Sequence, residues 1–96
     1  MAKATRREDD ESLYRAIMTL TSVEECRAFF EDLCSDTEIA AMEQRYAVAS
    51  MLLDNKVYAD IMEATNAGTA TVSRVNRMLS RGTGALRAAA KRAKES

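Results

Sequence analysis

Side chains that could bind a nucleic acid are concentrated between residues 56 and 81. Hydroxyl, amide and guanidinium groups form hydrogen bonds with base edges and phosphates, and the chain has no acidic residue from position 64 to position 94. The alternative is that these groups only solvate an exposed helix, which is the commoner case for an arbitrary helical hairpin. The residues that we predict to contact DNA are Lys56, Thr69, Thr71, Ser73, Arg74, Asn76, Arg77 and Arg81.

Most of these residues lie in a stretch, residues 57–79, that is predicted to form two helices separated by a tight turn. Val57, Ile61 and Ala64 have the spacing of one helix face. The connection that follows contains Gly68, which we expect to adopt a positive φ angle, as sharp turns between helices often require. A helix, a short turn with glycine and a second helix together predict a helix-turn-helix.

The second of these helices is predicted to have an apolar face and a polar face. Thr69 is expected to cap its first turn through the side-chain hydroxyl. Val72, Val75 and Leu79 are spaced to face the protein core. On the polar face we expect Thr69, Thr71, Ser73, Asn76 and Arg77 near bases, and Lys56, Arg74 and Arg81 near phosphates.

Charge is divided unevenly along the chain. The 96 residues have a net charge of −1, which by itself does not indicate a nucleic-acid partner. Residues 1–54 contain 6 basic and 12 acidic residues, a net charge of −6, whereas residues 55–96 contain 8 basic and 3 acidic residues, a net charge of +5. A basic half that includes the predicted DNA-contacting helix is the electrostatic footprint of a protein with a polyanionic partner.

The rest of the sequence predicts further helices and an all-α fold. The chain contains no proline and is rich in residues that favour helices. Ser22 with Glu25, and Ser35 with Glu38, have capping-box spacing and mark two helix starts. We predict a flexible N-terminal arm over residues 1–10 and a single helical domain over residues 11–96. Its other helices are expected over residues 11–20, 23–33, 36–53 and 85–94, the last capped by Thr83.

Two of these helices have apolar stripes that need a covering surface. Both phenylalanines, Phe29 and Phe30, lie in the helix over 23–33, which we interpret as core or as the seam of a dimer. A short chain buries limited surface alone, so a dimer is expected. The inward stripe predicted for the helix over 23–33 is Val23, Cys26, Phe29, Phe30 and Leu33, and that for the helix over 36–53 is Ile39, Met42, Tyr46, Ala49, Leu52 and Leu53.

Other classes of function find little support in the sequence. Cys26 and Cys34 match no metal-ligand or redox spacing and are interpreted as reduced core residues. No segment approaches the roughly 18 apolar residues of a membrane helix, and the N-terminus lacks an apolar signal core, so a cytoplasmic protein is expected. The chain has no histidine and no glycine-rich phosphate loop. We therefore expect no enzyme activity, no metal site and no cofactor.

The run from Ala67 to Leu79, AGTATVSRVNRML, resembles the Trp repressor family, and more closely its YerC/YecD branch. Upstream, Leu33, Thr37-Glu38 and Met42–Arg45 are similar to positions of the family's third helix, so that the resemblance covers about residues 30–82. It implies an all-α, six-helix chain that forms a dimer by interlocking its N-terminal and C-terminal helices. Each subunit of such a dimer offers one helix-turn-helix to DNA.

The resemblance also implies a candidate effector site. In Trp repressor, tryptophan lies between the third helix and the recognition helix, flanked by an arginine from each and close to a threonine. Arg45, Arg74 and Thr71 stand at these positions here. Val75 stands where Trp repressor has a glycine, and Met78 stands where it has a serine. We therefore expect a different small ligand, or no ligand, in place of a tryptophan corepressor.

Together these features predict a sequence-specific DNA-binding transcriptional regulator, a repressor by resemblance, that acts as a homodimer on double-stranded DNA. The alternative is a helical protein-interaction module without a specific DNA target. Binding of nucleic acid with a strong salt dependence would favour the regulator. Binding without such dependence would favour the interaction module.

Overall fold

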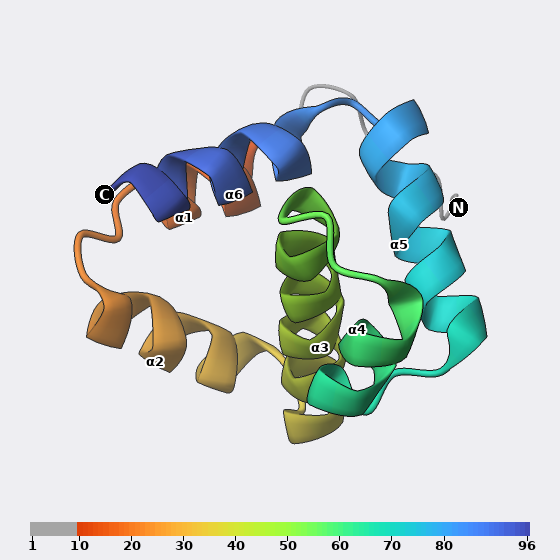
Figure 1. The fold of residues 1–96 in the computed structure, drawn as a ribbon. Coiled ribbons are helices and arrows are strands. Elements are labelled where there is room, and N and C mark those ends of the chain that lie inside the picture. The colour runs from red at the N-terminus through yellow and green to blue at the C-terminus, as the bar shows by residue number, and fades with distance from the viewer. Residues whose placement is uncertain (1–9) are drawn as a thin grey trace, which may run out of the picture. The chain divides into compact units, whose positions relative to one another are not determined.

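A computed structural model describes residues 10–96, so the arm predicted over residues 1–10 lies almost wholly outside the described residues. The described residues form six helices and no strand (Figure 1). No helix among them is both long enough and apolar enough to cross a membrane. The predicted all-α, six-helix fold class is confirmed. The helices are α1 (Ser12–Ile17), α2 (Val23–Leu33), α3 (Asp36–Leu53), α4 (Tyr58–Thr65), α5 (Thr69–Arg81) and α6 (Ala85–Glu95).

The chain divides into two compact units. The first ends at Asp36 and contains α1 and α2, and the second, Thr37–Ser96, contains nearly all of α3 together with α4, α5 and α6. The second unit carries every residue that the sequence predicts to contact DNA. The single helical domain over residues 11–96 stays a prediction.

In the first unit, α2 begins as predicted, whereas α1 is shorter than predicted. α1 ends at Ile17 because the backbone then tightens, and the amide of Leu20 donates to the Ile17 carbonyl, only three residues back. At the start of α2, the Ser22 hydroxyl oxygen accepts from the Glu25 amide at 3.0 Å. The Glu25 carboxylate reaches back to the Thr21 amide at 2.8 Å. This reciprocal pair differs by one residue from a standard capping box.

The first unit has apolar side chains but no described residue that is buried. Val23 and Leu33, both predicted to face inward, are 71% and 56% exposed. Phe29 and Phe30 are half-buried and pack edge to face, with ring centroids 5.3 Å apart. The predicted inward face of α2 therefore remains largely uncovered in one chain.

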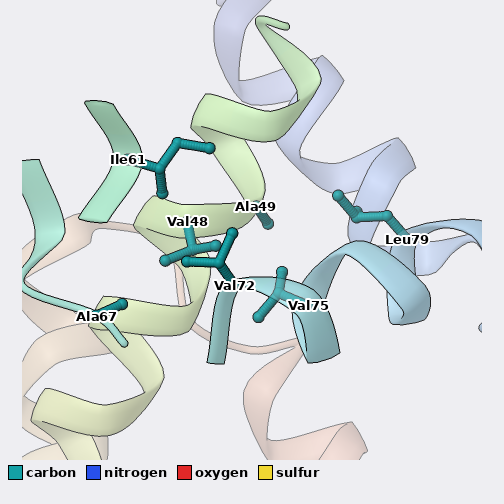
Figure 2. Close-up of a cluster of buried hydrophobic side chains, with 7 residues drawn as sticks. All are labelled: Val48, Ala49, Ile61, Ala67, Val72, Val75 and Leu79. Atoms are coloured by element: carbon teal, nitrogen blue, oxygen red, sulfur yellow. The ribbon is translucent and has the colours of Figure 1, made fainter. Parts of the chain in front are cut away.

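The buried core lies in the second unit, where α3, α4 and α5 meet. Its side chains point toward one another from the three helices and from the connection between α4 and α5 (Figure 2). Leu86 of α6 packs against this cluster. The predicted inward positions on α5 are confirmed. The cluster consists of Val48, Ala49, Ile61, Ala67, Val72, Val75 and Leu79.

The buried face of α3 is only partly the predicted one. Ala49 is fully buried as predicted, but Met42 and Tyr46 are exposed. Val48, which was not predicted, is fully buried beside Ala49. The helix is apolar on more than one side, so periodicity alone does not select the face that packs.

The buried face of α4 also differs from prediction. The helix begins at Tyr58, and Val57 is the residue before it, with 62% of its surface exposed. Ala64 is exposed as well, whereas Ile61 is fully buried and Tyr58 packs against the core. The inward face is therefore formed by Tyr58, Ile61 and Thr65, at i, i+3 and i+7. The predicted face was rotated because Val57 lies outside the helix.

The connection between α4 and α5 uses a different residue for its left-handed conformation than the sequence predicts. Asn66 has a φ angle of 62°, whereas Gly68 has a φ angle of −80°. Asparagine tolerates the left-handed region better than most residues do. The Thr65 hydroxyl donates to the Ile61 carbonyl at 2.7 Å and accepts from the Ala67 amide at 3.2 Å. The turn is thus built by Thr65 and Asn66, and Gly68 needs no special backbone freedom.

We expect Asn66→Ala to lower the free energy of unfolding by about 1 kcal/mol, because alanine pays a steric cost in the left-handed region. Gly68→Ala should change it by less than about 0.5 kcal/mol, since a β-carbon at Gly68 meets no atom within 4 Å. Urea unfolding of both variants measures the difference. A larger loss for Gly68→Ala than for Asn66→Ala would contradict this account of the turn.

Candidate nucleic-acid interface

The orientation of α5 is determined by three buried side chains. Val72 and Val75 are 0% and 1% exposed, and Leu79 is 7% exposed. A helix turns about 100° per residue, so these positions place Arg74, Arg77 and their neighbours on the opposite side. The core thereby presents the polar face of α5 to solvent.

Three arginines form a row on this outward face. Arg74, Arg77 and Arg81 lie at i, i+3 and i+7, and all three are exposed. Within residues 10–96, none of them forms a hydrogen bond or ion pair through its side chain. Together with Met78 and Gly82 they line an open hollow of about 340 Å³. Their guanidinium donors therefore remain available to an anionic ligand.

Thr69 lies at the start of α5 but does not cap it. The residue before the helix is Gly68, and no side chain caps the first turn. The Thr69 hydroxyl instead lies 3.6 Å from the sulfur of Met62 on α4. The predicted Thr69 cap is therefore wrong, because the helix begins one residue earlier than a threonine cap requires. The side chain is exposed at the end of the helix that we expect to approach DNA first.

The other predicted base-contacting residues lie toward the flanks of α5. Thr71 and Ser73 are half-buried, and Asn76 is exposed. The Asn76 side-chain nitrogen donates to the hydroxyl oxygen of Tyr58 on α4 at 3.2 Å. Sequence reasoning missed Tyr58, although its spacing to Ile61 would have placed it on the inward face of α4.

Lys56 lies in the connection between α3 and α4, two residues before the first residue of α4. Its backbone amide donates to the Met51 carbonyl at 3.1 Å, while its side chain is exposed and has no partner among the described residues. The preceding Asn55 adopts a φ angle of 63°, which turns the chain sharply here. The ammonium group is thus free to contact a phosphate.

The candidate effector residues are distributed over two helices. Arg45 is exposed on α3, and Arg74 is exposed on α5. Next to Arg45, the side-chain nitrogen of Gln44 donates to the Thr65 carbonyl at 3.1 Å, which ties this part of α3 to the end of α4. Of the two residues that depart from the Trp repressor pattern, Val75 belongs to the buried core and Met78 is 45% exposed.

Some of the positive charge of the second half is used to hold α6. The Lys94 ammonium lies 2.8 Å from the Asp54 carboxylate at the end of α3. A guanidinium nitrogen of Arg87 donates to the Leu79 carbonyl at 3.4 Å. The predicted Thr83 cap is wrong, because Gly84 precedes the first residue of α6 and no side chain caps its first turn. The Thr83 hydroxyl instead accepts from the Ala85 amide at 3.2 Å. Unlike the arginines of α5, these cations have partners within the protein.

The fold is therefore that of an all-helical protein in which α4 and α5 are joined by a three-residue connection and α5 presents an acid-free, cationic face. The chain belongs to the Trp repressor family, a family of transcription regulators and not of enzymes. The family model described as Trp repressor protein matches residues 8–94. The resemblance seen in the motif sequence is thus confirmed over almost the whole chain.

Individual relatives agree with this assignment. The chain is 44% identical over 85 residues to the uncharacterized protein YerC of Bacillus subtilis (strain 168). The aligned region covers 88% of this chain and 82% of YerC. A TrpR-like protein from Eubacterium eligens has a similar crystal structure, with a TM-score of 0.83 and 43% identity, covering 88% of this chain and 87% of the other. A candidate Trp repressor from Staphylococcus aureus matches with a TM-score of 0.85 and 40% identity, over 93% and 89% of the two chains.

Proposed function

We propose that the protein is a sequence-specific DNA-binding transcriptional regulator, a repressor in line with its family, that acts as a homodimer. In this proposal α4, the connection and α5 serve as a helix-turn-helix. The observation that carries the proposal is the row of exposed arginines on α5, Arg74, Arg77 and Arg81, whose side chains have no partner among residues 10–96. An unpaired cationic row on a helix whose other face is buried in the core is suited to a polyanion.

In the proposed complex, α5 enters the major groove and α4 crosses the DNA backbone, as in other helix-turn-helix proteins. Arg77 lies near the middle of the outward face of α5, opposite the buried side chains, and is placed to read a base edge. Arg74 and Arg81 lie beside it, and Lys56 precedes α4, so that these three are suited to phosphates. Thr69, Thr71 and Ser73 supply hydroxyl groups at the N-terminal end of α5, where base contacts concentrate.

The homodimer is supported by apolar surface that one chain leaves uncovered. Several large apolar side chains of α1 and α2, or next to them, are exposed, and no described residue of these two helices is buried. A second copy that covers them would pair two α5 helices for half-sites about one helical turn apart. Light scattering on the eluted peak of a sizing column should give a dimer, and a monomer would contradict this part of the proposal. The exposed side chains are Leu13, Tyr14, Met18, Val23 and Leu33.

The regulator proposal is tested by selecting binding sites from random duplex DNA and measuring affinity at two salt concentrations. We expect a palindromic sequence that is bound with a steep salt dependence, because phosphate contacts release counterions. A selection without a consensus, followed by weak binding that salt hardly changes, would contradict the proposal. The search would then turn to protein partners of the helical module.

Arg77→Ala should weaken binding to the selected site by about 1–3 kcal/mol and relax the preference at one base pair, if the guanidinium contacts guanine in a bidentate manner. Binding to a panel of sites substituted at each position measures this. Arg77→Lys is the matched variant, because it keeps the charge and loses the bidentate geometry. Equal weakening on every DNA would show that Arg77 contacts a phosphate.

L-Tryptophan should leave DNA affinity unchanged, because Met78 replaces the serine that serves the ligand's amino group in Trp repressor. Affinity for the selected site, measured with and without saturating L-tryptophan, checks this expectation. An increase in affinity would show that the site tolerates Val75 and Met78. If a different small ligand binds, we propose that it contacts Arg45, Thr71 and Arg74, and Arg45→Ala should then abolish its effect.

A further inference from the structure

We infer that Tyr58 contacts DNA directly, its hydroxyl donating a hydrogen bond to a backbone phosphate, and that Asn76 holds this hydroxyl in place. The inference rests on the proposed function and adds a residue that the sequence pattern does not suggest. It also changes the role of Asn76, which acts by positioning Tyr58 and not by reading a base.

The Tyr58 ring is held in a defined position. Tyr58 is the first residue of α4, it is half-buried, and its ring packs against the buried cluster between α3, α4 and α5. A ring anchored on a core has little freedom, so its hydroxyl oxygen occupies a restricted region near the surface. Lys56, two residues before Tyr58 in the chain, is exposed.

The hydrogen bond with Asn76 determines how the hydroxyl can be used. The Asn76 side-chain nitrogen donates to the Tyr58 oxygen at 3.2 Å, so the oxygen acts as an acceptor. A phenolic hydroxyl also has one proton to donate, and within residues 10–96 no acceptor for it is found. Accepting one hydrogen bond polarises the hydroxyl and strengthens the bond that it donates.

The surroundings of the hydroxyl favour a phosphate as its acceptor. Tyr58 and Asn76 join the two helices of the proposed helix-turn-helix, and the first of these helices crosses the DNA backbone. The nearest acidic residue along α4, Asp60, is two positions on and thus about 200° around the helix. Asparagine and tyrosine side chains are both common donors to phosphates. A neutral donor two residues along the chain from Lys56 would fix the position of a phosphate that the lysine attracts.

The experiment measures fluorescence anisotropy of the selected duplex and of a scrambled duplex, each at two salt concentrations, for wild type and Tyr58→Phe. This substitution removes one oxygen and keeps the ring that packs on the core. We expect binding to both duplexes to weaken by about tenfold, as for a lost hydrogen bond to a charged group. The salt dependence and base preference should stay as in wild type, since no charge is lost.

Three further variants show whether the effect belongs to Tyr58. Lys56→Ala should lower the salt slope by about 1, which Tyr58→Phe should not do. Asn76→Ala should weaken both duplexes by less than Tyr58→Phe does, and Tyr58→Phe should cost less in that background because the hydroxyl is no longer oriented. Tyr46→Phe, at an exposed tyrosine of α3, should bind as wild type does.

Several results would overturn the inference. Wild-type affinity for Tyr58→Phe would show that the hydroxyl does not contact DNA. A loss of affinity confined to one base pair would show that Tyr58 and Asn76 read a base. A loss of affinity accompanied by a matching fall in melting temperature would show that the two residues serve stability. If wild type itself binds no duplex, the proposed function fails and the inference fails with it. If wild type binds and Tyr58→Phe binds equally well, only the inference fails, so the two failures are distinguishable.

Discussion

The double variant Arg74→Ala/Arg77→Ala should bind the selected DNA about a hundredfold more weakly than wild type. Each lost contact to a base or phosphate is expected to cost about 1–3 kcal/mol, and about 1.4 kcal/mol corresponds to a factor of ten. Both side chains are exposed and have no partner in the described part of the protein. Their removal should therefore leave the fold intact, and the effect should be confined to DNA.

This result is measured by anisotropy at several salt concentrations, because a lost phosphate contact also lowers the salt slope by about 1. Arg27→Ala is the matched control, since Arg27 is an exposed arginine of α2 in the acidic half of the chain. It should keep nearly full affinity. If Arg27→Ala and the double variant weaken binding to a similar extent, net charge and not the α5 face is responsible.

Ile61→Ala should have the largest effect on stability, lowering the free energy of unfolding by about 2–5 kcal/mol. Ile61 is 0% exposed and lies among Val48, Val72 and the other buried side chains of the core (Figure 2). Truncation removes apolar contacts from α3 and α5 at once and leaves a cavity that the helices fill only in part. Such a loss is a large share of the stability of a small protein.

Val57→Ala is the control for this prediction, because it also deletes methyl groups from an aliphatic residue near α4. Val57 is 62% exposed, so the change should cost less than about 0.5 kcal/mol. Urea unfolding of both variants at equal protein concentration measures the two losses. Similar losses would mean that Val57 faces the core, as the sequence pattern alone predicts, and would contradict the observed face of α4.

The helices themselves could be predicted well because their signals are local. Ser22 with Glu25 marks the start of α2, and glycines separate α5 from α6. The inward face of α5 was also predictable, since Val72, Val75 and Leu79 are its main apolar residues and leave no competing face. Where one face is clearly apolar, hydrophobic periodicity determines which side packs.

The errors occurred where several local solutions are nearly equal in energy. In α3, Met42 and Tyr46 have the same apolar character as Val48, and only the packing of α4 and α5 selects Val48. In the turn, Asn66 and Gly68 can both adopt the left-handed conformation. Asn66 is the residue that does so, directly after Thr65, whose hydroxyl bonds to the Ile61 carbonyl and the Ala67 amide. These differences depend on packing across the second unit, so the residue pattern of a single helix or turn does not show them.

The sequence by itself determined the helical class, the family, the basic second half and the acid-free polar face of α5, because these depend on composition and on spacing within one element. Tertiary structure decided which faces of α3 and α4 are buried and which polar groups have partners. It placed the Asn76 amide against the Tyr58 hydroxyl and the Lys94 ammonium against the Asp54 carboxylate, and it left the α5 arginines without a partner in the described part of the chain. Such pairings link residues far apart in the chain, so their energies depend on distances in space that no local pattern encodes.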